Sequence, residues 1–276
     1  MTSGGGWQEL ERDGVRLAVR DHGGEGPPVL LLHGLAGHAG EWDETAAWLT
    51  PRHRVLALEA RGHGRSERRP GDVSRAAHVA DVAFAIERPL GGEPVVLVGQ
   101  SLGGHAALLL AAEHPELVRA LVLADAGPAP APDPAAMAAR VAGWLAAWPA
   151  PFRSHEAAVA FFAGEGMPAP VAAAWADGLE PREGGWWLRF DADVMERTLR
   201  EAVALDLWGA WERIRCPTLV VRAGEGHILA EHAREMVERL PGTRLVELPG
   251  ATHDLHLDRP GAWREALVGF LEEVAS

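Results

Sequence analysis

The chain has 276 residues, of which 47% are hydrophobic, and its formal net charge is −13. This length allows one large α/β domain with an inserted subdomain, and the acidic charge argues against DNA, RNA or an anionic membrane as a partner. Lys and Tyr are absent, which excludes Schiff-base chemistry, attachment of pyridoxal phosphate, P-loop nucleotide binding and a phenolic acid or nucleophile.

Short apolar runs rich in Val and Leu recur along the chain between segments of helical spacing. Such runs predict buried parallel strands, and the segments between them predict crossover helices. Their alternation favours an α/β fold, in which helices cover both faces of a mostly parallel, twisted sheet. An antiparallel pair near residues 7–12 and 15–23 is expected to extend one edge. The other expected strands lie within residues 27–34, 54–62, 94–101, 118–127, 217–224 and 243–253.

The alternation stops between residues 129 and 212, where Ala, Pro and aromatic residues dominate. This stretch begins in a Pro-rich link and holds seven of the eleven Trp. We expect a mostly helical cap here, inserted into a core domain made of residues 1–128 and 213–276. About half of its aromatic side chains are expected to pack inside the cap, and the others to face an apolar substrate cavity. The candidate substrate-binding side chains are Trp42, Trp144 and Trp187.

The strongest local signal is the sequence GQSLGG at residues 99–104, where an expected strand turns directly into an expected helix. A serine on so tight a turn projects its hydroxyl above the sheet edge, and the flanking glycines admit close approach of the backbone. The helix N-terminus directs N–H groups toward developing negative charge. Ser101 is therefore the candidate nucleophile; the alternative is a glycine-rich turn whose serine only caps the helix.

With this motif the chain resembles the α/β-hydrolase family over nearly its whole length. Landmarks follow the buried strands in the family's order: His33-Gly34, then RGHGRS at residues 61–66, then the serine turn, then GATH at residues 250–253. The resemblance implies an oxyanion hole made by backbone N–H groups, one from the residue after the nucleophile and one from the His-Gly loop. These groups belong to Leu102 and Leu35.

The general base implied by the resemblance is His253, in the loop after the last strand. A serine hydroxyl is a weak nucleophile unless a nearby imidazole accepts its proton, so one histidine is required. Other histidines are expected to have structural roles: His33 braces the oxyanion loop, His63 belongs to a turn, and His256 packs or hydrogen-bonds beneath the base.

The acid departs from the family's commonest pattern. Most members place an Asp where this chain has His227, and an imidazole cannot supply a fixed negative charge. Some subfamilies, including haloalkane dehalogenases, take the acid from the strand that ends here at Asp125. Asp125 would complete the order Ser, Asp, His and hold the imidazole tautomer. Glu225, or an Asp125 with a purely structural role, remains open at this point.

Serine at the turn excludes two branches of the resemblance, because dehalogenases and epoxide hydrolases attack with Asp. The expected function is that of a serine hydrolase acting on a small carboxylic ester or lactone through an acyl-enzyme. Carbon-carbon bond hydrolysis, amide hydrolysis and perhydrolysis share these parts. A cofactor-free oxygenase and a non-catalytic small-molecule receptor on the same fold are the alternatives from other classes.

No cofactor or metal is expected, since the chain lacks a dinucleotide fingerprint, an H-E-x-x-H pattern and a second cysteine beside Cys216. The N-terminal residues show neither a basic start nor an apolar stretch. We therefore expect a cytoplasmic protein, a monomer or homodimer, whose partner is a small-molecule substrate rather than a nucleic acid or a membrane.

Overall fold

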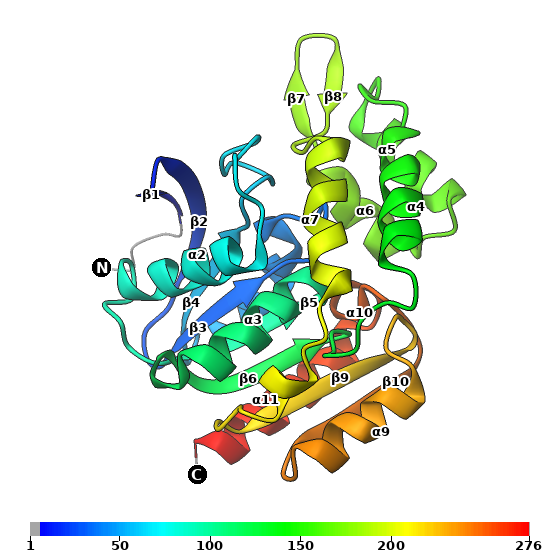
Figure 1. Cartoon of the computed structure of the whole chain (residues 1–276). Helices are drawn as coiled ribbons and strands as arrows, with labels where there is room; N and C mark the ends of the chain where they lie inside the picture. The colour runs from blue at the N-terminus through cyan, green and yellow to red at the C-terminus, as the bar shows by residue number, and fades with distance from the viewer. Residues whose placement is uncertain (1–5, 276) are drawn as a thin grey trace.

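A computed structural model describes residues 6–275, and an eight-stranded sheet forms its centre (Figure 1). The strand order is β1-β2-β4-β3-β5-β6-β9-β10. β1 and β2 form an antiparallel pair at one edge, β2 runs antiparallel to β4, and the other neighbours are parallel. The expected α/β fold with a mostly parallel sheet is therefore confirmed. The strands are β1 (Gly6–Arg12), β2 (Val15–Gly23), β3 (Pro28–Leu32), β4 (Arg54–Glu59), β5 (Val95–Gln100), β6 (Val118–Ala124), β9 (Thr218–Glu225) and β10 (Arg244–Thr252).

Helices cover both faces of this sheet, each over its own apolar core. One core is built with α2 (Arg75–Glu87), α3 (Ser101–Glu113), α8 (Trp208–Trp211) and α9 (Ala230–Arg239). The other core is built with η1 (Ala39–Trp42), α1 (Asp43–Leu49), α10 (Leu255–Asp258) and α11 (Pro260–Val274). The short turn η2 (Pro115–Leu117) leads from α3 into β6.

The two cores explain why an inner strand such as β3 is apolar throughout. In β3, Leu30 and Leu32 enter the first core, while Val29 and Leu31 enter the second, and all four are buried. Successive side chains of a strand point to opposite faces, so a strand covered on both faces cannot alternate apolar with polar residues.

Between β6 and β9 the chain leaves the sheet and forms a separate group of elements. Figure 1 shows its helices gathered beside the sheet, with a small hairpin projecting away from them. They share an apolar cluster of their own that includes Trp148, Phe162 and Phe190. The elements are α4 (Pro134–Ala146), α5 (His155–Gly164), α6 (Ala169–Asp177), β7 (Glu180–Arg182), β8 (Gly185–Trp187) and α7 (Ala192–Ala204).

This helical group starts and ends at adjacent points of the backbone. The N–H of Leu207 donates to the carbonyl of Pro128 at 2.9 Å. The predicted cap, residues 129–212, also includes α8, but α8 packs against α3, and Trp211 lies fully buried in the core of the sheet layer. The Nε1–H of Trp211 donates to the carbonyl of Met236 on α9 at 2.9 Å. The chain therefore leaves the helical group and rejoins the sheet layer before residue 212.

The C-terminal ends of parallel strands meet at one edge of the sheet, and three strands deliver side chains of interest there. β5 ends at the turn that carries Ser101, β6 is followed by Asp125, and β10 is followed by His253. Loops at this edge are where open α/β sheets build their ligand sites.

Candidate active site

The turn after β5 holds Ser101 in a backbone conformation that ordinary residues rarely adopt. Its φ is 48°, and a non-glycine residue in this region stores about 1–3 kcal/mol of strain. The neighbouring glycines make the turn possible. A Cβ at Gly99 would lie 2.6 Å from the carbonyl carbon of Gly103, and a Cβ at Gly103 would lie 2.5 Å from the carbonyl oxygen of Leu32. The close packing of β5, α3 and β3 therefore requires glycine at both positions.

The loop after β3 packs directly on this turn. A Cβ at Gly34 would lie 2.1 Å from Oε1 of Gln100, so the two segments leave no room for a side chain between them. Leu35 in this loop and Leu102 at the start of α3 both line the same cavity as Ser101. The first N–H groups of a helix have no partner within the helix, so the N–H of Leu102 is free to bind an anion.

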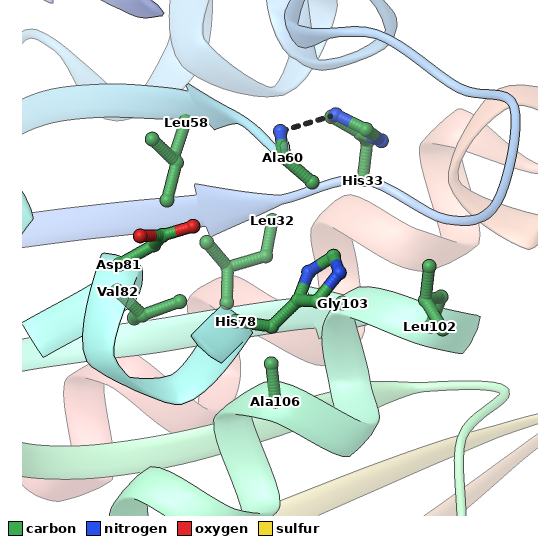
Figure 2. A pocket seen from close by; sticks show the side chains of 10 residues that line it. All are labelled: Leu32, His33, Leu58, Ala60, His78, Asp81, Val82, Leu102, Gly103 and Ala106. Carbon is green, nitrogen blue, oxygen red and sulfur yellow. Dashed lines mark hydrogen bonds between the residues drawn. The ribbon is translucent and has the colours of Figure 1, made fainter. Parts of the chain in front are cut away.

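His33 braces the loop that follows β3. Its Nδ1 lies 2.7 Å from the carbonyl oxygen of Gly34, and its Nε2 accepts the N–H of Ala60 at 3.1 Å. Figure 2 shows this second bond beside a small pocket of about 20 Å³, whose lining residues include Leu102 and Gly103. Complete burial holds the pKa of His33 well below 6.5, and the ring stays neutral, as a brace requires.

Asp125 and His253 form a hydrogen-bonded pair on the cavity wall. Nδ1 of His253 lies 2.6 Å from Oδ2 of Asp125, whose side chain is fully buried. The same carboxylate accepts the backbone N–H groups of His227, at 2.7 Å, and of Ala223, at 3.2 Å. Asp125 itself has a φ of 44°, a second strained position in the site.

Each member of this pair shifts the pKa of the other. Burial raises the pKa of Asp125, but the hydrogen bonds from His253 and from the backbone outweigh it and lower the pKa below 3.8. Burial lowers the pKa of His253, but the hydrogen bond and the charge of Asp125 outweigh it and raise the pKa above 6.5. The pair therefore stabilises an imidazolium on His253.

Glu225, the alternative acid, lies elsewhere. It ends β9 with an exposed side chain, whereas Nδ1 of His253 is bonded to Asp125. The loop that follows Glu225 lies directly on Asp125, because a Cβ at Gly226 would be 2.2 Å from Oδ2 of Asp125. The geometry therefore pairs the imidazole with the carboxylate of β6.

The contact between His227 and His253 was not predicted from the sequence. The ring of His227 stacks on the ring of His253, with centroids 3.8 Å apart and planes 24° from parallel. Partial burial, followed by the charge of His253, lowers the pKa of His227. A neutral ring thus lies against the imidazole, at the position where the resemblance noted from the sequence would place an acid.

Asp254 was also missed, and it joins the base to the helical group. Nε1–H of Trp175 on α6 donates to its Oδ2 at 3.0 Å, and Nε2 of Gln100 donates to its Oδ1 at 3.3 Å. On the same helix, the carbonyl of Ala174 lies 2.9 Å from Nε2 of His38. These contacts join segments that are far apart in the chain, so no local sequence pattern predicts them.

A cavity of about 810 Å³ lies between the sheet edge and the helical group. Ser101, His253 and Asp125 line it, together with Leu35 and Leu102. Its other walls are mostly apolar and are formed by the segment 126–132 and by α4, α6, α7 and the start of α9. Its largest apolar side chains are those of Met137, Trp144, Met167 and Trp175.

Of the three Trp predicted to bind substrate, Trp144 lines this cavity, and Trp42 and Trp187 do not. Trp42 is fully buried in the second core, where it stacks on His256 with ring centroids 4.3 Å apart. Trp187 is 37% exposed on the β7–β8 hairpin. Both assignments are therefore wrong. Trp42 is close in sequence to the His-Gly loop, but its ring packs in the core and not in the cavity. Trp187 lies on a hairpin that projects away from the helices, so its side chain does not line the cavity.

Within residues 6–275, no three His, Cys, Asp or Glu side chains are grouped so as to hold a metal ion. In the same range, no helix combines the length and apolar character needed to cross a membrane.

The chain is similar to known hydrolases both in sequence and in structure. A family model described as the alpha/beta hydrolase fold matches residues 27–260. The chain is 29% identical over 265 residues to the 2-(acetamidomethylene)succinate hydrolase of Mesorhizobium japonicum, covering 94% of this chain and 92% of that protein. It is 28% identical over 272 residues to a putative carbamate hydrolase of a Caulobacter species, covering 92% and 95%. A solved structure of E-2-(acetamidomethylene)succinate hydrolase superimposes with a TM-score of 0.87 at 26% identity, over 97% of this chain and 99% of that one.

Proposed function

Since this chain belongs to the α/β-hydrolase fold family and the relatives named above are hydrolases, we propose that it is a serine hydrolase that cleaves small carboxylic esters or lactones. The observation that carries the proposal is the 2.6 Å bond between His253 and Asp125, on the wall of the cavity that Ser101 also lines. A nucleophile, a base and a group that orients the base are the parts that nucleophilic acyl transfer needs.

In the first half of the proposed reaction, Oγ of Ser101 attacks the substrate carbonyl carbon, and Nε2 of His253 takes the hydroxyl proton. The carbonyl oxygen becomes an oxyanion, which the backbone N–H groups of Leu102 and Leu35 bind. Asp125 accepts the Nδ1–H of His253 and thereby fixes the tautomer that leaves Nε2 free. When the intermediate collapses, His253 gives the proton to the leaving oxygen, and the acyl group stays on Ser101.

In the second half, water attacks the acyl-enzyme while His253 removes its proton. Collapse of the second intermediate returns the proton to Oγ of Ser101 and releases the carboxylic acid. The raised pKa of His253 favours the imidazolium that both steps form.

The walls of the cavity are mostly apolar, which favours a substrate with an apolar body. A cavity of about 810 Å³ lies within the range of small-molecule sites, and Trp144, Trp175 and Met137 give it apolar surface. Medium-sized or aromatic acyl groups suit such walls.

A second candidate is hydrolysis of an amide or carbamate, which the same residues perform with a nitrogen leaving group. It is favoured by the names of the two relatives, one a carbamate hydrolase and the other a hydrolase of an acetamido compound.

A matched panel separates the two candidates: 4-nitrophenyl esters and lactones of increasing acyl length, beside the 4-nitroanilides of the same acids. The proposal expects the esters and lactones to have the higher kcat/KM at each acyl length. Relative to the uncatalysed rates, faster turnover of the anilides would favour the second candidate.

A further inference from the structure

One face of α4 forms part of the cavity wall and carries a single charged side chain. The side chains of this face are Met137, Arg140, Val141 and Trp144. Residues three and four positions apart lie along one stripe of a helix, so Arg140 belongs to the cavity-facing stripe of α4. The other members of the stripe are apolar. An arginine that only aids solubility would be expected on the opposite face of the helix.

The charge of Arg140 is not balanced within the cavity. It is the one Lys or Arg among the described residues that line the cavity. Asp125 and Asp254 also line it, but they accept hydrogen bonds from His253 and from Trp175. Within residues 6–275, no ion pair or hydrogen bond engages the guanidinium of Arg140, and this residue is exposed although it lines the cavity.

The guanidinium of Arg140 lies near enough to the ring of His227 for its charge to act on that ring. After burial and the charge of His253, the charge of Arg140 contributes to lowering the pKa of His227. The ring of His227 in turn stacks on His253. A ligand bound to Arg140 would therefore extend along the wall that holds the base.

We propose that Arg140 binds a carboxylate of the substrate, so that the enzyme prefers a small ester that carries a free carboxylate away from the bond to be hydrolysed, such as the half-ester of a dicarboxylic acid. This inference rests on the proposed function. A guanidinium binds a carboxylate through two parallel hydrogen bonds, so one arginine suffices for this group. The apolar remainder of the cavity accommodates the carbon chain between the carboxylate and the scissile carbonyl.

A dianionic phosphate fits this cavity less well than a carboxylate does. Phosphate sites gather several donors around the anion, whereas the described walls offer one permanent cation. The net charge of −13 also opposes long-range attraction of a polyanion, so selectivity must come from the local contact.

The first test compares two substrates whose distal carboxyl group is either free and charged or methylated and neutral: mono(4-nitrophenyl) adipate and methyl 4-nitrophenyl adipate. We expect the wild-type protein to have the higher kcat/KM for the half-ester. Arg140→Gln should lower kcat/KM for the half-ester about tenfold and change that for the diester less than about twofold. Arg140→Lys should retain part of the preference. The control is Arg153→Gln, an exposed arginine away from the cavity, which should change neither value.

The second test measures binding without turnover, by calorimetric titration of the Ser101→Ala protein with monomethyl adipate and dimethyl adipate. The expected result is tighter binding of the monoanion, which adding Arg140→Gln removes. Equal affinity for the two esters, or a preference that survives Arg140→Gln, overturns the inference. Equal kinetic losses for both esters in Arg140→Gln also overturn it. If hydrolysis depends on Ser101 but proceeds equally well with the charged and the neutral ester, the inference fails and the proposed function stands. If Ser101→Ala does not affect hydrolysis, the proposed function itself is overturned.

Discussion

Oδ2 of Asp125 lies 2.6 Å from Nδ1 of His253, although the two residues are 128 positions apart in the chain. The same oxygen accepts the backbone N–H of His227, so the residue at the family's usual acid position helps to hold the carboxylate of another strand. His253 is thus paired with the carboxylate that follows β6, and not with a side chain at the end of β9.

The first prediction concerns the identity of the acid. Asp125→Asn should lower kcat by about 10³- to 10⁴-fold, because an amide cannot hold the imidazole tautomer or stabilise the imidazolium. Glu225→Gln, a change at an exposed side chain, should lower kcat less than about twofold. Steady-state kinetics of both variants, with thermal melts to verify folding, provide the test. If Glu225→Gln were the damaging substitution, the acid would belong to β9.

The second prediction concerns the ring stacked on the base. His227→Ala should lower kcat roughly two- to tenfold with little change in KM, since aromatic pairs contribute about 0.5–1.5 kcal/mol and this one fixes the plane of His253. His227→Phe keeps a ring at this position and should retain most of the activity. Equal kinetic losses in the two variants would show that the stack itself has no effect.

The third prediction uses the crowding around Asp125. Gly226→Ala places a methyl group 2.2 Å from Oδ2 of Asp125, so either the carboxylate or the loop must move. A displacement near 1 Å at a catalytic group can reduce turnover by about 10²-fold, and a fall in kcat of that order is expected. Gly261→Ala is the matched control, because no atom lies within 4 Å of its added methyl. A wild-type kcat in Gly226→Ala would mean that the loop can move to accept the methyl group without disturbing the bond between Asp125 and His253.

The fourth prediction concerns stability against acid. Burial lowers the pKa of His256 to about 3, and within the described residues neither ring nitrogen has a hydrogen-bond partner. Between the ordinary pKa of 6.5 and this value, the unfolded chain binds a proton that the folded chain does not, so stability falls as the pH is lowered through this window.

His256→Phe keeps the stack on Trp42 and removes the titration. The free energy of unfolding of this variant should therefore depend less steeply on pH between about 6.5 and 3 than that of the wild type. Chemical denaturation at several pH values measures this slope. A wild-type slope in His256→Phe would contradict the assignment of a neutral buried ring.

The sequence was sufficient for the fold because its signals are local. The apolar run at residues 94–98 leads into the sequence GQSLGG, and the two become β5 and the strained turn at Ser101. Trp42 shows the limit of such reasoning. Its neighbours in the chain approach the site, but its ring points into the core on one face of the sheet, and that direction depends on packing against His256 and Trp263.

Contacts between distant segments could not be predicted from local signals. The donation from Trp175 to Asp254 and the stack of His227 on His253 depend on how the helical group and the loop after β9 settle over the strand ends. No spacing rule connects positions so far apart. The pairing of Asp125 with His253 was accessible only because the resemblance supplied the order of the strands, and its catalytic role stays a prediction.

Covalent labelling of Ser101 is the most direct test of the proposed mechanism. A fluorophosphonate probe requires a serine activated by its base, and the stoichiometry and site of modification can be read by intact-protein and peptide mass spectrometry. We expect one adduct per chain, located on Ser101, with loss of ester hydrolysis in proportion to labelling. We also expect a fall in kcat of about 10³-fold or more in Ser101→Ala, because the oxyanion hole retains part of the rate. An unlabelled Ser101, or full activity in the alanine variant, would contradict the serine-hydrolase mechanism.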